Sequence, residues 1–146
     1  MTRQHVVAAI VILVGLYDAG VGLFMLFSQS PHLAHGTSTL WAHALEAAGP
    51  ETKVVLASLF ARMGAFSLHA GVVSIVWCAI SWRNRRAMSA LLLTYLVTGM
   101  AFFTSDARYF AGTPYFVVKQ TLGGLWMFAV VLHFWPRRDA ANKYIR

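Results

Sequence analysis

Four stretches of the chain are apolar over about the length that is needed to cross a lipid bilayer. They span residues 6–27, 54–82, 87–103 and 115–135, and a transmembrane helix needs roughly 17 to 25 residues. Lipid offers the backbone no hydrogen-bonding partners, so each stretch is expected to be helical. The sequence therefore predicts an all-α fold, an integral membrane four-helix bundle in which residues 1–146 form a single transmembrane domain.

The composition of the chain agrees with a membrane location. Hydrophobic residues make up 58% of the chain and charged residues 12%, whereas about 25% of the residues in an average soluble domain are charged. No soluble segment interleaves basic and aromatic residues, so we interpret the net charge of +7 as attraction to anionic headgroups rather than to nucleic acid. The expected partners are membrane lipids and, as a further possibility, a larger membrane complex. The oligomeric state stays open.

The basic residues predict how the helices are oriented. Eight of the 12 Lys and Arg residues flank the four runs on one side, and these are Arg3, Arg83, Arg85, Arg86, Arg137, Arg138, Lys143 and Arg146. The positive-inside rule places such residues in the cytoplasm. We therefore expect both termini to be cytoplasmic, in what is most simply a bacterial inner membrane.

The segment 28–53 is the longest one outside the apolar runs. Residues 37–39, which are Thr, Ser and Thr, would cap a short helix, and Gly49 with Pro50 would end it. The apolar residues of this segment fall on one helical face, and these are Leu40, Trp41, Ala44, Leu45 and Ala48. The pattern predicts a short amphipathic helix in the first external loop, lying on the outer leaflet.

Three histidines in the same loop raise the question of a metal site. His32, His35 and His43 lie close together in sequence. No cysteine or carboxylate completes a recognisable ligand pattern with them, so we interpret them as surface residues and expect no metal.

Several polar residues lie inside the apolar runs. Ionisable groups at such depth cost a few kcal/mol each, so they are expected to face the bundle interior, water or one another. At about 1.5 Å per residue, Asp18 and Arg62 reach a similar depth, whereas Lys119 lies about two turns nearer the outer surface, close to Asp106. We therefore expect two ion pairs, Asp18 with Arg62 and Asp106 with Lys119.

Two interpretations of these charges stay open. In the first, the ion pairs are structural and fix which helices are neighbours. In the second, a polar cavity in the outer half of the bilayer binds an anionic or carbonyl-bearing headgroup through Arg62 and Lys119, while Asp18 balances their charge. The candidate ligand-binding residues are then Asp18, Arg62, His69, Lys119 and Gln120.

His69 also raises the question of a cofactor. Ala65 precedes His69 by four residues, which resembles the A-x-x-x-H context in which light-harvesting polypeptides ligate chlorophyll. A bis-histidine haem would need a second histidine at the same depth, but His5 and His133 lie at the cytoplasmic ends. The favoured interpretation is a neutral His69 that is hydrogen-bonded to a hydroxyl group such as that of Ser67, and no cofactor is expected, with quinone or haem as the alternatives.

The chain lacks the common catalytic motifs. It contains no nucleophile elbow, no H-E-x-x-H, no P-loop, no G-x-G-x-x-G after a strand and no paired carboxylates at helical spacing. The sequence therefore favours a protein that is not an enzyme.

Three motifs carry a resemblance to a known family. The first run has a central glycine-rich stretch, the second contains Arg62-Met63-Gly64, and the third continues into the segment RYFAGTP at 108–114. This order resembles the small DoxX-like four-helix membrane proteins, and the resemblance implies a compact bundle and, for some relatives, a link to quinone-coupled oxidoreductase complexes. Many such relatives carry an acidic residue early in the fourth helix, where this chain has Lys119 and Gln120.

The expected function follows from these features. We expect a small non-catalytic inner-membrane protein with a polar cavity in the outer half of the bilayer, acting as an accessory or lipid-binding protein. The alternative is a subunit of a membrane oxidoreductase complex that binds a quinone-like headgroup. A haem or pigment protein is the third expectation.

Overall fold

The chain is helical throughout the part that the structure, a computed structural model, describes, which is residues 2–27, 47–111 and 114–136. It contains the helices α1 (Arg3–Phe27), α4 (Pro50–Ser81), α5 (Arg85–Phe110) and α6 (Pro114–Phe134), and these residues form no strand. All four helices are long and apolar enough to cross a membrane. The predicted all-helical fold with four candidate spans is thereby confirmed, whereas most of the predicted loop helix and its three histidines lie outside the described residues.

Local sequence signals explain where two of the helices begin. Pro50 opens α4 in the first turn, where its missing N–H costs nothing, and Glu51 adds a negative charge at the positive end of the helix. The side chain of Asn84 caps α5 by accepting hydrogen bonds of 3.1 and 3.2 Å from two amides of the first turn. This cap starts α5 at Arg85, two residues before the predicted run at 87–103.

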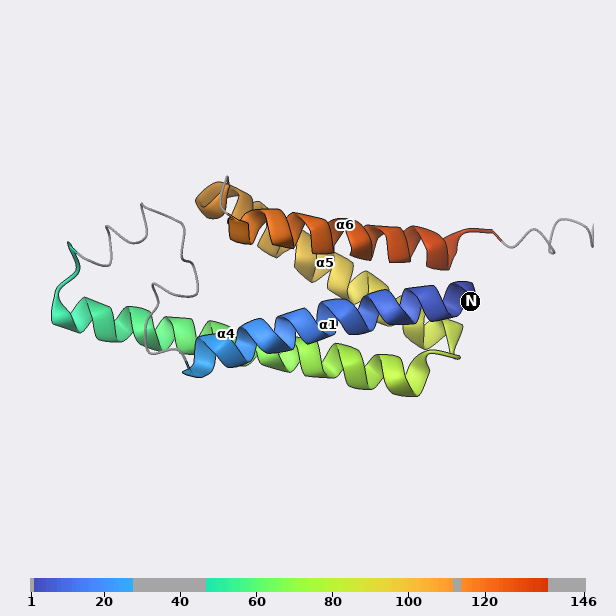
Figure 1. Cartoon of the computed structure of the whole chain (residues 1–146), viewed down its shortest axis with the longest axis horizontal. Coiled ribbons are helices and arrows are strands. Elements are labelled where there is room, and N and C mark those ends of the chain that lie inside the picture. Colours follow the sequence, from blue (N-terminus) through green and yellow to red (C-terminus); the bar gives the residue numbers. More distant parts are fainter. Residues whose placement is uncertain (1, 28–46, 112–113, 137–146) are drawn as a thin grey trace, which may run out of the picture.

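The four helices run alternately in opposite directions (Figure 1). At one end of the bundle α1 and α5 begin while α4 and α6 end. We call it the basic end, because it carries Arg3, Arg83, Arg85 and Arg86 in and between these helices. We call the opposite end the outer end; there α1 ends at Phe27 and α6 begins at Pro114. The predicted orientation places the basic end in the cytoplasm.

The closest helix contact joins α1 to α4 through four glycines, Gly15 and Gly22 on α1 and Gly64 and Gly71 on α4. A Cβ added to Gly22 would lie 2.7 Å from the carbonyl oxygen of Gly64, and one added to Gly71 would lie 2.5 Å from the carbonyl oxygen of Gly15. Because these neighbours are backbone atoms, no side chain fits between the helices here. On each helix the two glycines are seven residues apart, or about two turns, so both fall on one face.

The hydrophobic core lies in the half of the bundle nearest the basic end. Its most deeply buried side chains include Val11, Cys78, Leu92 and Ala129, which come from all four helices. Trp126 of α6 is 4% exposed, and its indole Nε1 donates a hydrogen bond of 3.1 Å to the carbonyl oxygen of Leu92 on α5. The core therefore ties α5 and α6 to the tightly packed α1–α4 pair.

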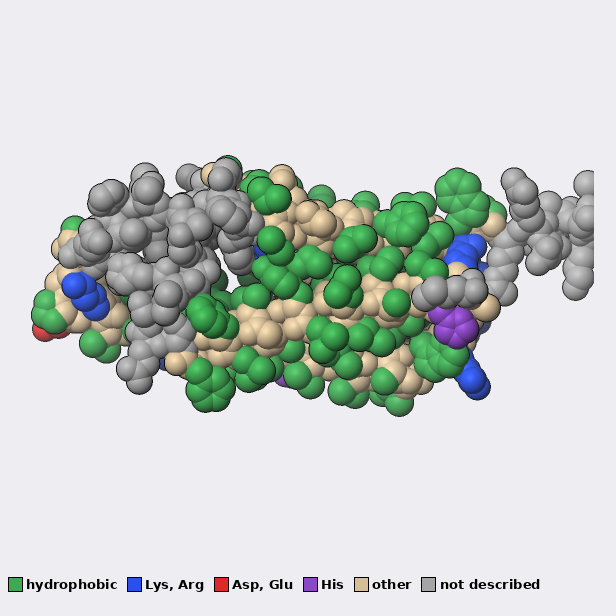
Figure 2. All heavy atoms as spheres, viewed as in Figure 1, with side chains coloured by type: hydrophobic (Ala, Val, Ile, Leu, Met, Phe, Trp, Pro, Cys, Tyr) green, Lys and Arg blue, Asp and Glu red, His purple; other side chains and the backbone are tan. Residues whose placement is uncertain are grey.

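The outer surface of the helices is strongly apolar. Figure 2 shows hydrophobic side chains over most of the visible face of the bundle, with the basic ones mostly near its two ends. Large residues such as Ile80, Val97 and Leu16 are more than half exposed. Water would not favour such a surface, but lipid chains cover it without cost, which supports an integral membrane protein.

The predicted orientation leads to a direct test. A reporter fused after Arg146 is expected to be cytoplasmic, whereas one inserted near Thr37 is expected to be on the opposite side of the membrane. Paired alkaline phosphatase and fluorescent-protein fusions measure this, because each is active on one side only. The same side for both fusions would contradict an odd number of crossings between them, and with it the orientation of the four helices.

Candidate functional site

Asp18 of α1 is the centre of a polar cluster inside the bundle. Its side chain is 13% exposed. One carboxylate oxygen, Oδ2, accepts a hydrogen bond of 2.9 Å from the hydroxyl group of Tyr95 on α5. The other, Oδ1, lies 3.4 Å from Nζ of Lys119 on α6. The cluster therefore links three helices through one carboxylate.

Lys119 forms the accessible edge of this cluster. Its side chain is 29% exposed, and its ammonium group lies 5.6 Å from the centre of the Tyr17 ring on α1. This ring face attracts the cation in addition to the carboxylate. We call Tyr17, Asp18, Tyr95 and Lys119 the Asp18 cluster.

The hydrophobic core, which lies nearer the basic end, holds the Asp18 cluster in place. The ring of Tyr95 stacks on that of Trp126 with 4.6 Å between the ring centres, and Trp126 belongs to the core. On the other side, the hydroxyl group of Ser67 on α4 donates a hydrogen bond of 2.9 Å to the backbone oxygen of Asp18. Asp18 and Tyr95 are therefore fixed by packed neighbours.

The depth of the cluster makes its charges costly. Asp18 precedes Phe27, the last residue of α1, by nine residues, which is about 14 Å along the helix axis. In the predicted membrane orientation this position lies within the hydrocarbon, where an isolated charge costs several kcal/mol. The carboxylate and the ammonium group offset each other here, and the Tyr95 hydroxyl stabilises the ionised form of Asp18.

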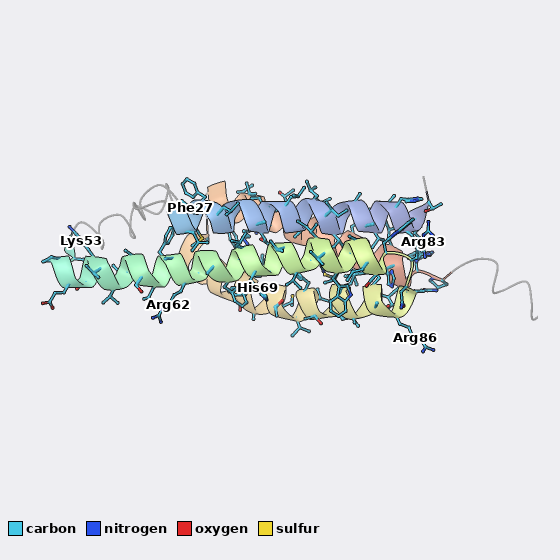
Figure 3. All side chains as sticks on the ribbon, turned by 90° about the horizontal axis from the view of Figure 1, so that it is seen from below. Phe27, Lys53, Arg62, His69, Arg83 and Arg86 are labelled. Atoms are coloured by element: carbon cyan, nitrogen blue, oxygen red, sulfur yellow. The ribbon has the colours of Figure 1, made fainter. Side chains whose placement is uncertain are left out.

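Arg62 does not join this cluster. It is exposed on α4, and Figure 3 shows it pointing away from α1 near the level of Phe27. The reason is rotational, because Gly64 faces α1 and a residue two positions earlier lies about 200° around the helix. The structure thus pairs Asp18 with Lys119 and not, as predicted, with Arg62. The side chain of Asp106, the predicted partner of Lys119, lies outside the described residues.

His69 and Gln120 are exposed side chains on two different helices. His69 is exposed on α4, seven residues after Arg62 and therefore on the same helical face, away from the α1 contact. Gln120 is exposed on α6. The hydroxyl group of Ser67, expected near His69, instead donates to the backbone of α1. Of the five candidate ligand-binding residues, the structure brings together Asp18 and Lys119.

Tyr95 and Tyr17 are members of the cluster that our sequence interpretation did not select for this role. A signal was present for Tyr95, which stands in the apolar stretch LLLTYLV of the third run. A tyrosine within a membrane helix needs a partner for its hydroxyl group, and a carboxylate on a neighbouring helix supplies one.

The described residues form no group of three or more His, Cys, Asp or Glu side chains that could hold a metal ion. No protein-family model, curated protein or solved structure matches the chain.

Proposed function

We propose that this chain is a small non-catalytic membrane protein that binds the polar head of a lipid beside Lys119, and that it acts as an accessory protein. One observation carries the proposal: an ammonium group that is 29% exposed lies beside a carboxylate that stands about two and a half turns before the end of α1. A lipid headgroup that enters from the outer half of the bilayer would meet this cation. The chemical class of the ligand is an amphiphile with a phosphate or carbonyl oxygen.

The geometry of the ion pair would allow Lys119 to exchange the Asp18 carboxylate for a ligand oxygen. The distance of 3.4 Å between Lys119 Nζ and Asp18 Oδ1 is longer than the 2.7–2.9 Å typical of a charge-assisted hydrogen bond. Asp18 is meanwhile held at 2.9 Å by Tyr95, so its charge stays stabilised if Lys119 shifts. A flexible lysine can therefore turn toward a ligand oxygen while the carboxylate remains satisfied.

A second candidate is a quinone-like headgroup, held by the protein as a subunit of a membrane oxidoreductase complex. Aromatic rings near the outer end favour it, because Phe103 of α5 and Phe116 of α6 are stacked with 5.7 Å between their centres. A quinone ring can stack on such a pair while its carbonyl oxygen accepts a hydrogen bond from Lys119. The DoxX-like resemblance belongs to this second candidate. The third expected function was that of a haem or pigment protein. A visible absorption spectrum of the purified protein tests it, because both cofactors absorb visible light.

Substitution of Lys119 tests the proposal. The protein purified in mild detergent is expected to retain a lipid or quinone, and Lys119→Gln should lower the retained amount about tenfold, the effect of losing one charge-assisted contact. Native mass spectrometry, followed by lipid and quinone extraction, measures this and identifies the ligand.

Arg62→Gln is the matched control, because it removes the same charge from a face that points away from the cluster. It should leave the ligand in place, and Lys119→Arg should restore most of it. Thermal unfolding in detergent identifies variants that have lost the fold. A ligand complement that is the same in Lys119→Gln and wild type, or an equal loss in both Gln variants, would contradict a site at Lys119.

A further inference from the structure

A small pocket opens at the basic end, far from the Asp18 cluster. Arg3, Gln4, Val7, Arg85 and His133 line it, so it gathers residues from α1, α5 and α6. Its described lining contains two guanidinium groups and no carboxylate. The pocket is therefore positively charged.

Both arginines are held in place by the last turn of α6 and its continuation. Nη2 of Arg3 donates a hydrogen bond of 2.6 Å to the carbonyl oxygen of Trp135, and Nη2 of Arg85 donates one of 3.2 Å to that of His133. A guanidinium group carries five N–H donors, so these contacts position each planar group and leave further donors on it. The two arginines thus converge on one pocket from two different helices.

The third polar group of the pocket is a buried imidazole. His133 is 8% exposed, and its Nε2 lies 2.9 Å from the hydroxyl group of Ser89 on α5. Two helices begin at this end and two end there, so their dipoles offset one another, and the positive charge of the pocket comes from the two guanidinium groups. The surroundings of the pocket favour an anion through fixed groups.

We propose that Arg3 and Arg85, which line this pocket, bind the phosphate group of an anionic lipid at its opening. The planar guanidinium group binds phosphate oxygens in a bidentate manner, and two of them suit a tetrahedral anion. Phe134 and Trp135, which follow His133 in the chain, are 44% and 62% exposed, so this end of α6 offers apolar surface to acyl chains. The ligand is thus an amphiphile with a phosphate group, and this site is independent of the one proposed at Lys119.

The adjacent residues Arg85 and Arg86 allow a matched comparison. Both side chains are exposed, but Arg85 lines the pocket and Arg86 does not. In the full chain reconstituted with phosphatidylglycerol and phosphatidylcholine, Arg85→Gln is expected to lower the bound ratio of the first lipid to the second about tenfold by native mass spectrometry. Arg86→Gln, with the same change of charge, should lower it less than about twofold. Equal ratios in the two variants would overturn the proposal.

A measurement on the wild-type chain avoids any loss of folding caused by Arg85→Gln. In zwitterionic detergent, the imidazole NMR signals of His133, assigned from their loss in His133→Gln, are followed during titration with short-chain phosphatidylglycerol. Inorganic phosphate and sodium chloride are titrated separately at matched ionic strength. Saturable shifts with the lipid that chloride does not reproduce support the proposal. Shifts with inorganic phosphate alone would overturn the lipid as the source, and no saturable shift would overturn the site.

Discussion

Replacing Gly22 by alanine is expected to lower the free energy of unfolding by about 1–3 kcal/mol, the usual cost of overpacking a close contact. The new Cβ would meet the backbone nitrogen of Leu68 and lie 2.7 Å from the carbonyl oxygen of Gly64. Backbone atoms cannot rotate away as a side chain can, so α1 and α4 must move apart along their length. Thermal or denaturant unfolding in detergent, followed by circular dichroism, measures the loss.

Gly20 supplies the control on the same helix. No atom lies within 4 Å of the position that its Cβ would occupy, so alanine fits there without any shift. Gly20→Ala should leave stability unchanged or raise it by up to about 1 kcal/mol, because glycine is a poor helix former. If both substitutions destabilise the protein to the same extent, the glycines of α1 do not act through contact with α4.

The spans were predictable because lipid leaves the backbone few choices. A run of apolar residues that enters the hydrocarbon has to satisfy its own N–H and C=O groups, which only a helix does locally. The ends of the helices were less predictable, because they depend on single capping residues. Asn84 starts α5 at Arg85, before the apolar pattern begins.

The partner of Asp18 was not predictable from depth. Counting residues along each helix placed Asp18 and Arg62 at similar levels, but depth says nothing about which face a residue occupies. The seven-residue spacing of Gly15 with Gly22, and of Gly64 with Gly71, carried that information in the sequence. Once these faces are joined, Arg62 has to point away from α1.

Lys119 pairs with Asp18, although residue counting placed Lys119 about two turns nearer the outer surface. A lysine side chain has a flexible stem of four methylene groups, which lets the ammonium group lie well away from its own Cα. Asp18 has a short side chain and marks its own depth closely. Residue counting therefore gives the depth of a charged group more closely for aspartate than for lysine. Because of its longer reach, Lys119 could have been paired with carboxylates other than that of Asp106.

Removing the carboxylate of Asp18 is expected to be the most damaging single change in the Asp18 cluster. Breaking a fully buried ion pair by removing one partner costs about 3–5 kcal/mol, because the other charge stays buried. Lys119 is 29% exposed, so the loss for Asp18→Ala should lie toward or below the lower limit of that range. The variant also leaves the Tyr95 hydroxyl without its carboxylate, which adds to the loss.

A double-mutant cycle separates the ion pair from other effects. The double change of Asp18→Ala with Lys119→Met should cost less than the sum of the two single changes, because no charge is then left without its partner. Asp18→Ala with Arg62→Leu is the control, and its effects should add, since Arg62 lies on the far face of α4. Unfolding in detergent at a fixed pH gives all six free energies.

The two cycles distinguish a structural role of the ion pair from a ligand-binding role when each is measured both without and with bound lipid. Coupling between Asp18 and Lys119 in protein stripped of lipid would assign the pair a structural role, because no ligand is present to supply the energy. Coupling that grows when lipid is restored would connect the pair to binding, since a ligand that favours one arrangement of Lys119 adds its own free energy to that state. Additive effects for Asp18 with Lys119, or coupling of Asp18 with Arg62, would mean that the carboxylate has another partner in the membrane.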